Sequence, residues 1–277
     1  MIEDFSSWKQ FEVDATNYLN RNFSDAASFE HQGNSDSTVP DIFVSTHNGS
    51  FYIEAKKCPS QCGQFVLMPD TKNSKFEYSY QNKYPNNKYA QIIISFMNRH
   101  FSEFKDAGTS GKEIAFFGCK DIFAKWIKTA YANKGIKFII TNEFKLLLLE
   151  DISKAFDITA KFRIKRSGSR SPNQNDKEVI AKYINAEHCI NNSIITQDKR
   201  AFVLANENLD NKRFYIDKDE FMFSKIKTGI FEVRKLSNTF NSNVIFGLKL
   251  KPGFYGLTKH EMKQLLLSIP IDGSFPS

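Results

Sequence analysis

The chain is poor in cysteine. Its 277 residues include four, at positions 58, 62, 119 and 189, and their spacing fits no disulfide framework of a secreted protein. Cys58 and Cys62 are spaced as the first half of a zinc site, but Cys119 and Cys189 supply no matching second pair. We therefore expect neither disulfides nor structural zinc, and we expect the protein in a reducing cytoplasm, that of a bacterial cell.

Several other signals are missing. No apolar run approaches the roughly 20 residues that span a bilayer, and the first residues lack the basic and apolar regions of a secretory leader. The five histidines show no metal-ligand spacing, and no phosphate-binding loop, dinucleotide fingerprint or nucleophile elbow is present. With 41% hydrophobic and 25% charged residues, the composition is that of a globular protein with no membrane partner.

Charge is distributed unevenly along the chain, whose net charge is +7. Residues 1–157 hold 18 Lys+Arg against 19 Asp+Glu, a net of −1, whereas residues 158–277 hold 20 against 12, a net of +8. A nearly neutral half is thus joined to a basic half. This asymmetry indicates contact with a polyanion such as nucleic acid, although many basic proteins bind none.

The strongest local signal is a β-hairpin over residues 40–56. Two β-prone runs flank Asn-Gly at 48–49, a pair typical of two-residue hairpin turns. With this pair as the turn, Asp41 lies opposite Lys56. Because side chains alternate along a strand, Asp41, Glu54 and Lys56 share one face and apolar residues fill the other. Two carboxylates and one ammonium group beside an apolar surface have the layout of a divalent-metal site, although exposed hairpins also carry such charges.

Pro-Asp at 40–41, a hairpin, and Glu-x-Lys at 54–56 together resemble the signature of the PD-(D/E)XK nuclease superfamily, which includes many type II restriction endonucleases. The resemblance implies Mg²⁺, with Mn²⁺ as a substitute. It implies that Asp41, Glu54 and the carbonyl oxygen of Ala55 bind the metal, and that Lys56 positions or deprotonates the attacking water.

Two further residues are catalytic candidates on the same resemblance. Glu12 lies in an amphipathic helix expected over 3–23, and the first helix of such nucleases often supplies a carboxylate to the site. Gln64 follows the lysine at a spacing where some members place an auxiliary glutamine. Both have plain alternatives, a solvated helix residue and an ordinary strand residue. Asp36 is a fallback acid if Asp41 is misassigned.

The order of expected elements is helix, hairpin, strand, helix, strand, helix, strand over residues 1–157, which indicates an α/β (α+β) catalytic domain. The resemblance implies the restriction-endonuclease-like version, a mixed sheet flanked by helices with the site at one edge. Residues 158–277 change character, with short strands separated by polar turns. We expect them to form a second, β-rich and basic domain that binds and recognises DNA.

Two stretches of the second half are candidates for DNA contact. Residues 161–172 alternate basic and apolar residues before a Gly/Ser loop, and residues 234–243 combine cations with Asn and Ser, which suit phosphate and base contacts. A solvated edge strand is the alternative interpretation of the first stretch, and we favour nucleic-acid contact because a nuclease motif precedes it. The DNA-binding candidates are Arg163, Lys165, Arg166, Arg170, Arg234, Lys235 and Asn238.

These observations predict a Mg²⁺-dependent endonuclease that hydrolyses double-stranded DNA, of the sequence-specific type II class, acting as a homodimer because cutting both strands often uses two sites related by a two-fold axis. Two alternatives remain open. One is a DNA-repair or junction-resolving nuclease. The other is a non-catalytic DNA-binding protein whose nuclease site is vestigial.

Overall fold

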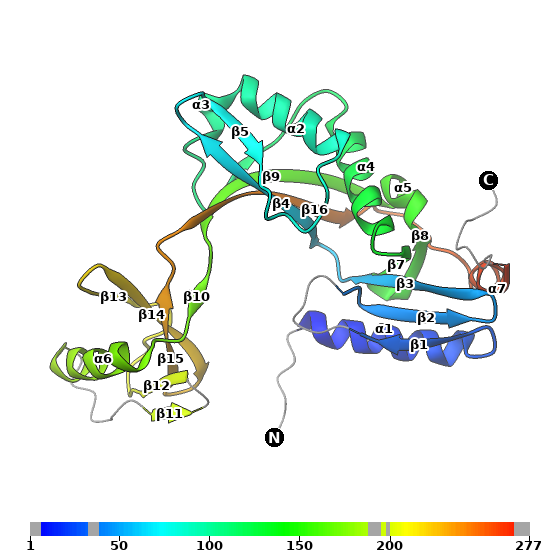
Figure 1. Cartoon of the computed structure of the whole chain (residues 1–277). Helices are drawn as coiled ribbons and strands as arrows, with labels where there is room; N and C mark the ends of the chain where they lie inside the picture. Colours follow the sequence, from blue (N-terminus) through cyan, green and yellow to red (C-terminus); the bar gives the residue numbers. More distant parts are fainter. Residues whose placement is uncertain (1–6, 33–38, 188–194, 198–199, 269–277) are drawn as a thin grey trace. The chain divides into compact units, whose positions relative to one another are not determined.

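The computed structural model describes residues 7–32, 39–187, 195–197 and 200–268 of the chain (Figure 1). They belong to two compact units. One comprises residues 1–163 and 242–277, and the other comprises residues 164–241. Within the described residues, no helix is both long and apolar enough to cross a membrane. The predicted class, α/β with a mixed sheet flanked by helices, is confirmed.

The first unit contains a five-stranded mixed sheet in the order β1-β2-β3-β7-β8. Its strands are antiparallel except for β3 and β7, which run parallel. The bounds of the strands are β1 Ala27–His31, β2 Ile42–Thr46, β3 Gly49–Lys56, β7 Ile136–Thr141 and β8 Lys145–Leu148. β3 is therefore a central strand with partners on both sides, which makes it a rigid support for the residues at its end.

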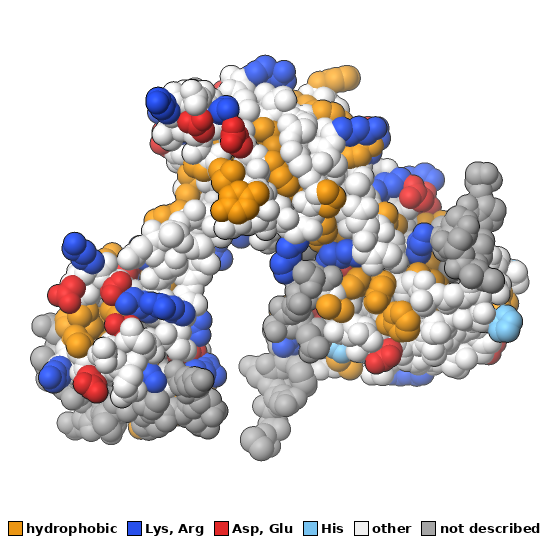
Figure 2. Space-filling view, in the orientation of Figure 1, with side chains coloured by type: hydrophobic (Ala, Val, Ile, Leu, Met, Phe, Trp, Pro, Cys, Tyr) orange, Lys and Arg blue, Asp and Glu red, His pale blue; other side chains and the backbone are white. Residues whose placement is uncertain are grey.

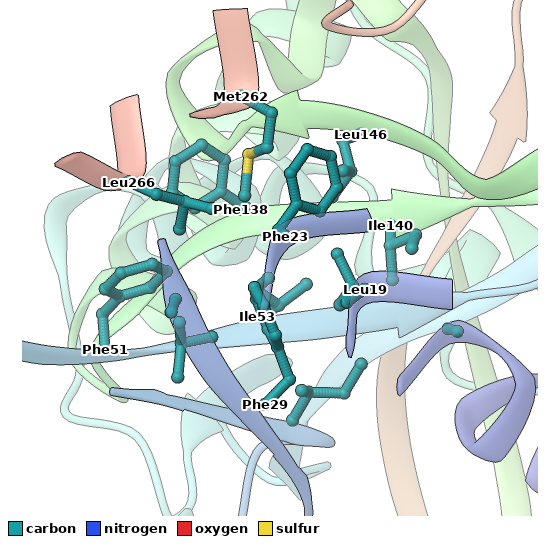
Figure 3. Close-up of a cluster of buried hydrophobic side chains, with 14 of the residues drawn as sticks. Leu19, Phe23, Phe29, Phe51, Ile53, Phe138, Ile140, Leu146, Met262 and Leu266 are labelled. Carbon is teal, nitrogen blue, oxygen red and sulfur yellow. The ribbon is translucent and has the colours of Figure 1, made fainter. Parts of the chain in front are cut away.

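Helices α1 (Ser7–Phe23) and α7 (Lys259–Ser268) share one apolar core with this sheet (Figure 3). Ala15, Leu19 and Phe23 recur at helical spacing in α1 and are almost fully buried, so they form the apolar stripe that a surface helix needs. They pack with the apolar face of the hairpin and with Met262 and Leu266 of α7. The expected apolar face of the hairpin is thus its core face.

A second sheet of the first unit has the order β5-β4-β16-β9-β6. Its strands are β4 Ser60–Asp70, β5 Lys75–Tyr78, β6 Lys112–Glu113, β9 Phe156–Arg166 and β16 Phe240–Leu250. The remaining helices of the unit are α2 Lys88–Arg99, α3 Phe101–Phe104, α4 Cys119–Ala132 and α5 Ile152–Ala155, with short 3₁₀ turns at Asn142–Phe144 and Leu149–Asp151. Buried aromatic rings join this sheet to α4, where Trp126 stacks on Phe246 with centroids 4.4 Å apart.

The described residues of the second unit form a six-stranded antiparallel sheet and one helix, α6 (Gln174–Glu187). Its strands are β10 Ser169–Arg170, β11 Ile195–Gln197, β12 Arg200–Leu204, β13 Arg213–Ile216, β14 Asp219–Lys227 and β15 Ile230–Leu236. It has a separate apolar core in which Ile180 and Ile184 of α6 pack with Phe221, Phe223 and other sheet residues.

This division differs from the expected domains of 1–157 and 158–277. Residues 242–277 return to the first unit because β16 pairs with β4 and because α7 supplies part of the first core. The net charges of the two observed units therefore differ from those of residues 1–157 and 158–277. Residues 164–241 hold 14 Lys+Arg against 10 Asp+Glu, a net of +4, which leaves +3 for the rest of the chain. On the face drawn in Figure 2, basic and acidic side chains are interspersed.

Candidate active site

The hairpin of β2 and β3 turns one residue earlier than its Asn-Gly pair predicts. Thr46 lies opposite Gly49, so His47 and Asn48 form the turn. Thr46 stabilises this turn, because its Oγ1 accepts a hydrogen bond from the Asn48 amide at 3.2 Å and donates one to the Gly49 carbonyl at 3.0 Å. The Asn48 side chain also donates to the Leu267 carbonyl near the end of α7, at 2.9 Å. The predicted turn position is therefore wrong by one residue.

The correction shifts the register by two, so every side chain keeps its predicted face. Ile42 pairs with Ile53, and this register places Asp41, just before β2, beside Glu54 rather than opposite Lys56. Oδ2 of Asp41 accepts a hydrogen bond of 2.8 Å from the Ala55 amide, which fixes the carboxylate next to the end of β3. The structure thus brings together Asp41, Glu54 and Lys56, as the sequence predicts.

Lys56 is bound to both carboxylates. Its Nζ lies 2.6 Å from Oε1 of Glu54 and 3.9 Å from Oδ2 of Asp41. Burial and the charge of Glu54 raise the pKa of Asp41 to about 7, against the opposing effect of Lys56. Burial lowers the pKa of Lys56, but the two carboxylates outweigh burial and the net shift is upward. One ammonium group therefore compensates incompletely for two buried carboxylates.

Glu12 is a third carboxylate beside this pair. It lies in α1, is 7% exposed, and its Oε2 is 3.3 Å from Nε2 of His31 at the end of β1. Glu12 also raises the pKa of Asp41, which places its charge close to the site. The structure therefore brings this predicted residue to the carboxylate pair, and it adds His31, which the sequence did not single out. Asp36 lies outside the described residues.

A cavity of about 690 Å³ opens beside Glu54 and Lys56. The other lining residues come from β4, from the segment 81–85 and from the region of α4, and they include Cys62, Gln64, Asn82, Tyr84, Tyr131 and Lys134. Gln64 is exposed and within reach of Gln61, whose amide lies 3.4 Å from its Oε1. The predicted auxiliary glutamine thus lies in the wall of the same cavity as the lysine.

Two other lining residues were not expected from the sequence. Cys62 is 2% exposed, and burial raises the pKa of its thiol. Tyr131 is 2% exposed and comes from α4. β4 approaches α4 closely because residue 63 is glycine, since a Cβ there would lie 3.1 Å from the ring of Trp126. Nothing in the local sequence of α4 indicates that it contributes to a site formed 75 residues earlier.

The donor set fits a divalent cation that prefers oxygen. Asp41 and Glu54 both have a carboxylate oxygen within 4.0 Å of the same ammonium group, and the Ala55 amide donates a hydrogen bond to Asp41. Among the described residues, no group of three or more His, Cys, Asp or Glu side chains is arranged as a complete metal cage. Mg²⁺ needs no such cage, because it commonly binds one or two carboxylates and keeps several waters. The incompletely compensated negative charge favours a cation at this place.

The seven DNA-binding candidates fall into two groups. Lys165, Arg170 and Asn238 have exposed side chains, and Arg170 and Asn238 line a cavity of about 400 Å³ in the second unit. Arg163 belongs to the first unit, where its Nε is buried. The remaining three bind other side chains of the protein.

Arg166, Arg234 and Lys235 each bind an acidic side chain of the second unit. Arg166 pairs with Glu220, and its guanidinium lies 5.5 Å from the ring centroid of Phe240. Lys235 lies 2.5 Å from Asp219 and 3.4 Å from Asp176. Arg234 donates to Glu232 at 3.0 Å and to the Ser169 carbonyl at 2.8 Å. These contacts give the three cations structural roles beside any role in binding DNA.

Comparison with solved structures gives a match over nearly the whole chain. The matched structure is a HhaI endonuclease in complex with DNA, with 36% sequence identity and a TM-score of 0.77, and the alignment covers 95% of this chain and 100% of that one. No protein-family model and no curated protein sequence matches the chain. Identity of this level over this length, together with the common fold, shows that the chain belongs to the HhaI endonuclease family and has the type II restriction endonuclease-like fold.

Proposed function

We propose that this protein is a Mg²⁺-dependent type II endonuclease that cuts double-stranded DNA at a specific sequence. The observation that carries the proposal is the arrangement of Asp41, Glu54 and Lys56, because the latter two line a cavity of about 690 Å³ and Asp41 lies 3.9 Å from the lysine. The proposal is also supported by the similarity, over 95% of the chain, to a HhaI endonuclease whose structure was solved with DNA.

The residues of the site suit phosphodiester hydrolysis. Asp41 and Glu54 would hold Mg²⁺, with the Ala55 carbonyl as a further ligand. When bound, the metal would supply Lewis-acid activation and charge neutralisation. Lys56 keeps its proton under ordinary conditions, because the carboxylates raise its pKa. Its role is therefore to bind the phosphate oxygens and orient the attacking water rather than to act as a free base.

The second unit, residues 164–241, is the proposed DNA-binding domain. It carries a net charge of +4, and its exposed candidates Lys165, Arg170 and Asn238 are free to meet phosphates or base edges. Arg163, Arg166, Arg234 and Lys235 stay in the proposal as a second group. The Nε of Arg163, in the first unit, is buried, and DNA binding by the other three competes with their contacts inside the protein.

The direct test is to incubate purified protein with unmethylated phage DNA in buffer containing Mg²⁺, Mn²⁺ or EDTA. The proposal predicts a reproducible set of discrete fragments with either metal and intact DNA with EDTA. Random nicking, or cleavage confined to branched substrates, would favour the repair or junction-resolving alternative. Binding without cleavage would favour a vestigial site.

The homodimer stays a prediction. One chain has one site of this kind among its described residues, so cutting a duplex takes either two chains or two successive events. Mass measurement in solution with and without DNA, together with the time course of plasmid cleavage, distinguishes the two. A dimer predicts a complex of two chains and direct conversion to linear plasmid, whereas nicked circles that accumulate before linear product would contradict it.

A further inference from the structure

Tyr131 carries a buried hydroxyl group that lacks a hydrogen-bond partner among the described residues. The residue lies in the last turn of α4 and is 2% exposed. Buried tyrosine hydroxyls usually have a partner, because leaving this group unpaired costs free energy. Such an unpaired group in a folded protein calls for an explanation, and a role in a functional site is one.

The surroundings of Tyr131 are those of the candidate active site. It lines the cavity together with Glu54, Lys56 and Cys62. Burial raises the pKa of its hydroxyl well above the usual range, and Glu54 contributes the largest share of the effect from neighbouring groups, ahead of Cys62 and Asp41. Tyr131 therefore stays protonated at any working pH, and its hydroxyl is a donor on a residue that lines the same cavity as Glu54.

In the structure the Glu54 carboxylate is engaged elsewhere, because Lys56 Nζ lies 2.6 Å from its Oε1. A divalent cation on Glu54 would compete with this ammonium group for the carboxylate. Carboxylates that bind metals are themselves held in place by hydrogen bonds from surrounding residues. A neutral, buried donor with no other partner in the described part of the chain suits that role, because it adds no charge to repel the cation.

We infer that Tyr131 is a positioning residue of the active site, whose hydroxyl donates to the Glu54 carboxylate and holds it in the orientation that binds the divalent metal. The inference rests on the proposed function, since it assigns Glu54 to the metal. It concerns a residue on a different element from the motif, 77 positions along the chain from Glu54.

The experiment compares wild type with Tyr131→Phe, which removes one oxygen atom and no hydrogen bond present in the described structure. The matched control is Tyr18→Phe, because Tyr18 is a partly buried tyrosine packed on the core of the same unit. For each protein we would measure thermal unfolding, Mn²⁺ binding without DNA by electron paramagnetic resonance, and phage DNA cleavage as a function of Mg²⁺ concentration.

The inference predicts that Tyr131→Phe unfolds no earlier than wild type and binds Mn²⁺ about tenfold or more weakly, the size typical of losing such an outer contact. Its cleavage should recover at high Mg²⁺, and Tyr18→Phe should match wild type in metal binding. Equal Mn²⁺ affinity of Tyr131→Phe and wild type, with wild type cutting DNA, would overturn the inference alone. A wild-type protein that neither binds Mn²⁺ nor cuts DNA would overturn the proposed function and the inference together.

Discussion

Nζ of Lys56 lies 2.6 Å from Oε1 of Glu54, while the residue between them, Ala55, donates its amide to Asp41 at 2.8 Å. Three consecutive residues of β3 thus organise the site. The two side chains on one face meet each other, and the intervening backbone fixes the carboxylate of the neighbouring strand. In its ion pair with Glu54, Lys56 balances the negative charge of the site as long as no metal ion does so.

The lysine should therefore have opposite effects on stability with and without metal. Lys56→Met leaves Asp41 and Glu54 buried without their shared cation, and breaking a buried pair in this way costs about 3–5 kcal/mol. In EDTA we expect a loss of unfolding free energy of this size, and in Mg²⁺ a much smaller one, because the cation replaces the ammonium group. Urea unfolding in the two buffers measures both. Lys75→Met, at an exposed pair with Glu77, is the control and should change little. The same loss of stability in both buffers would show that no cation binds there.

The raised pKa of Asp41 makes stability depend on pH. The carboxyl group titrates at about 7 in the folded protein and near 3.8 when unperturbed. The folded state therefore binds a proton between these values that the unfolded state has lost, so this contribution to stability is full below pH 4 and disappears as pH rises through 7. In EDTA, the unfolding free energy of wild type should fall more steeply from pH 5 to pH 8 than that of Asp41→Asn. Parallel curves for the two proteins would contradict the assigned pKa.

Metal binding should show the reverse dependence, because the cation needs the carboxylate form of Asp41. Mn²⁺ affinity should increase as pH rises toward and through 7. Glu12 raises the pKa of Asp41, so Glu12→Gln should move the midpoint of this increase to lower pH. Glu30→Gln is the control, since Glu30 is exposed on β1. Calorimetric titration with Mn²⁺ from pH 5.5 to 8.5 gives the midpoints, and identical midpoints in the two variants would mean that Glu12 does not act on the site.

The two groups of cations in the second unit should separate in DNA binding and stability. Arg170→Ala removes an exposed side chain, so it should weaken DNA binding and reduce the slope of log affinity against log salt by about one, without changing stability. Arg234→Ala removes a partner of the buried Glu232, so it should cost about 1–3 kcal/mol of unfolding free energy. Fluorescence anisotropy over a range of salt concentrations measures the DNA affinity of the two variants, and urea unfolding measures their stability. Unfolding at the wild-type denaturant concentration would contradict the structural role of Arg234.

The sequence predicts the arrangement of the hairpin side chains better than it predicts the division into two units. The face on which each hairpin side chain lies follows from the alternation along a strand alone. A register error of two residues does not change these faces, because only an odd shift moves a side chain to the other face. The turn itself is misplaced because Thr46 and the contact of Asn48 with Leu267, more than 200 residues away, outweigh the preference of Asn-Gly. Long-range packing of this kind leaves no local signal.

Long-range packing also explains why the sequence did not predict the domain boundary or the position of Tyr131 at the cavity. Nothing within residues 242–277 shows that β16 pairs with β4 or that α7 joins the first core. The helix of residues 119–132 reads as an ordinary amphipathic element, and only its position against β4, made possible by Gly63, brings Tyr131 to the cavity.

The assignment of Glu54 and Lys56 to the chemistry of a nuclease is tested most directly by single-turnover cleavage of phage DNA in Mg²⁺ by wild type, Glu54→Gln and Glu77→Gln. Glu77 is an exposed glutamate of the same unit and serves as the matched control. We predict discrete fragments from wild type and Glu77→Gln, and at least a thousandfold slower cleavage, on the order expected for a lost metal-binding group, from a folded, DNA-binding Glu54→Gln. Cleavage by Glu54→Gln at the wild-type rate would contradict the account.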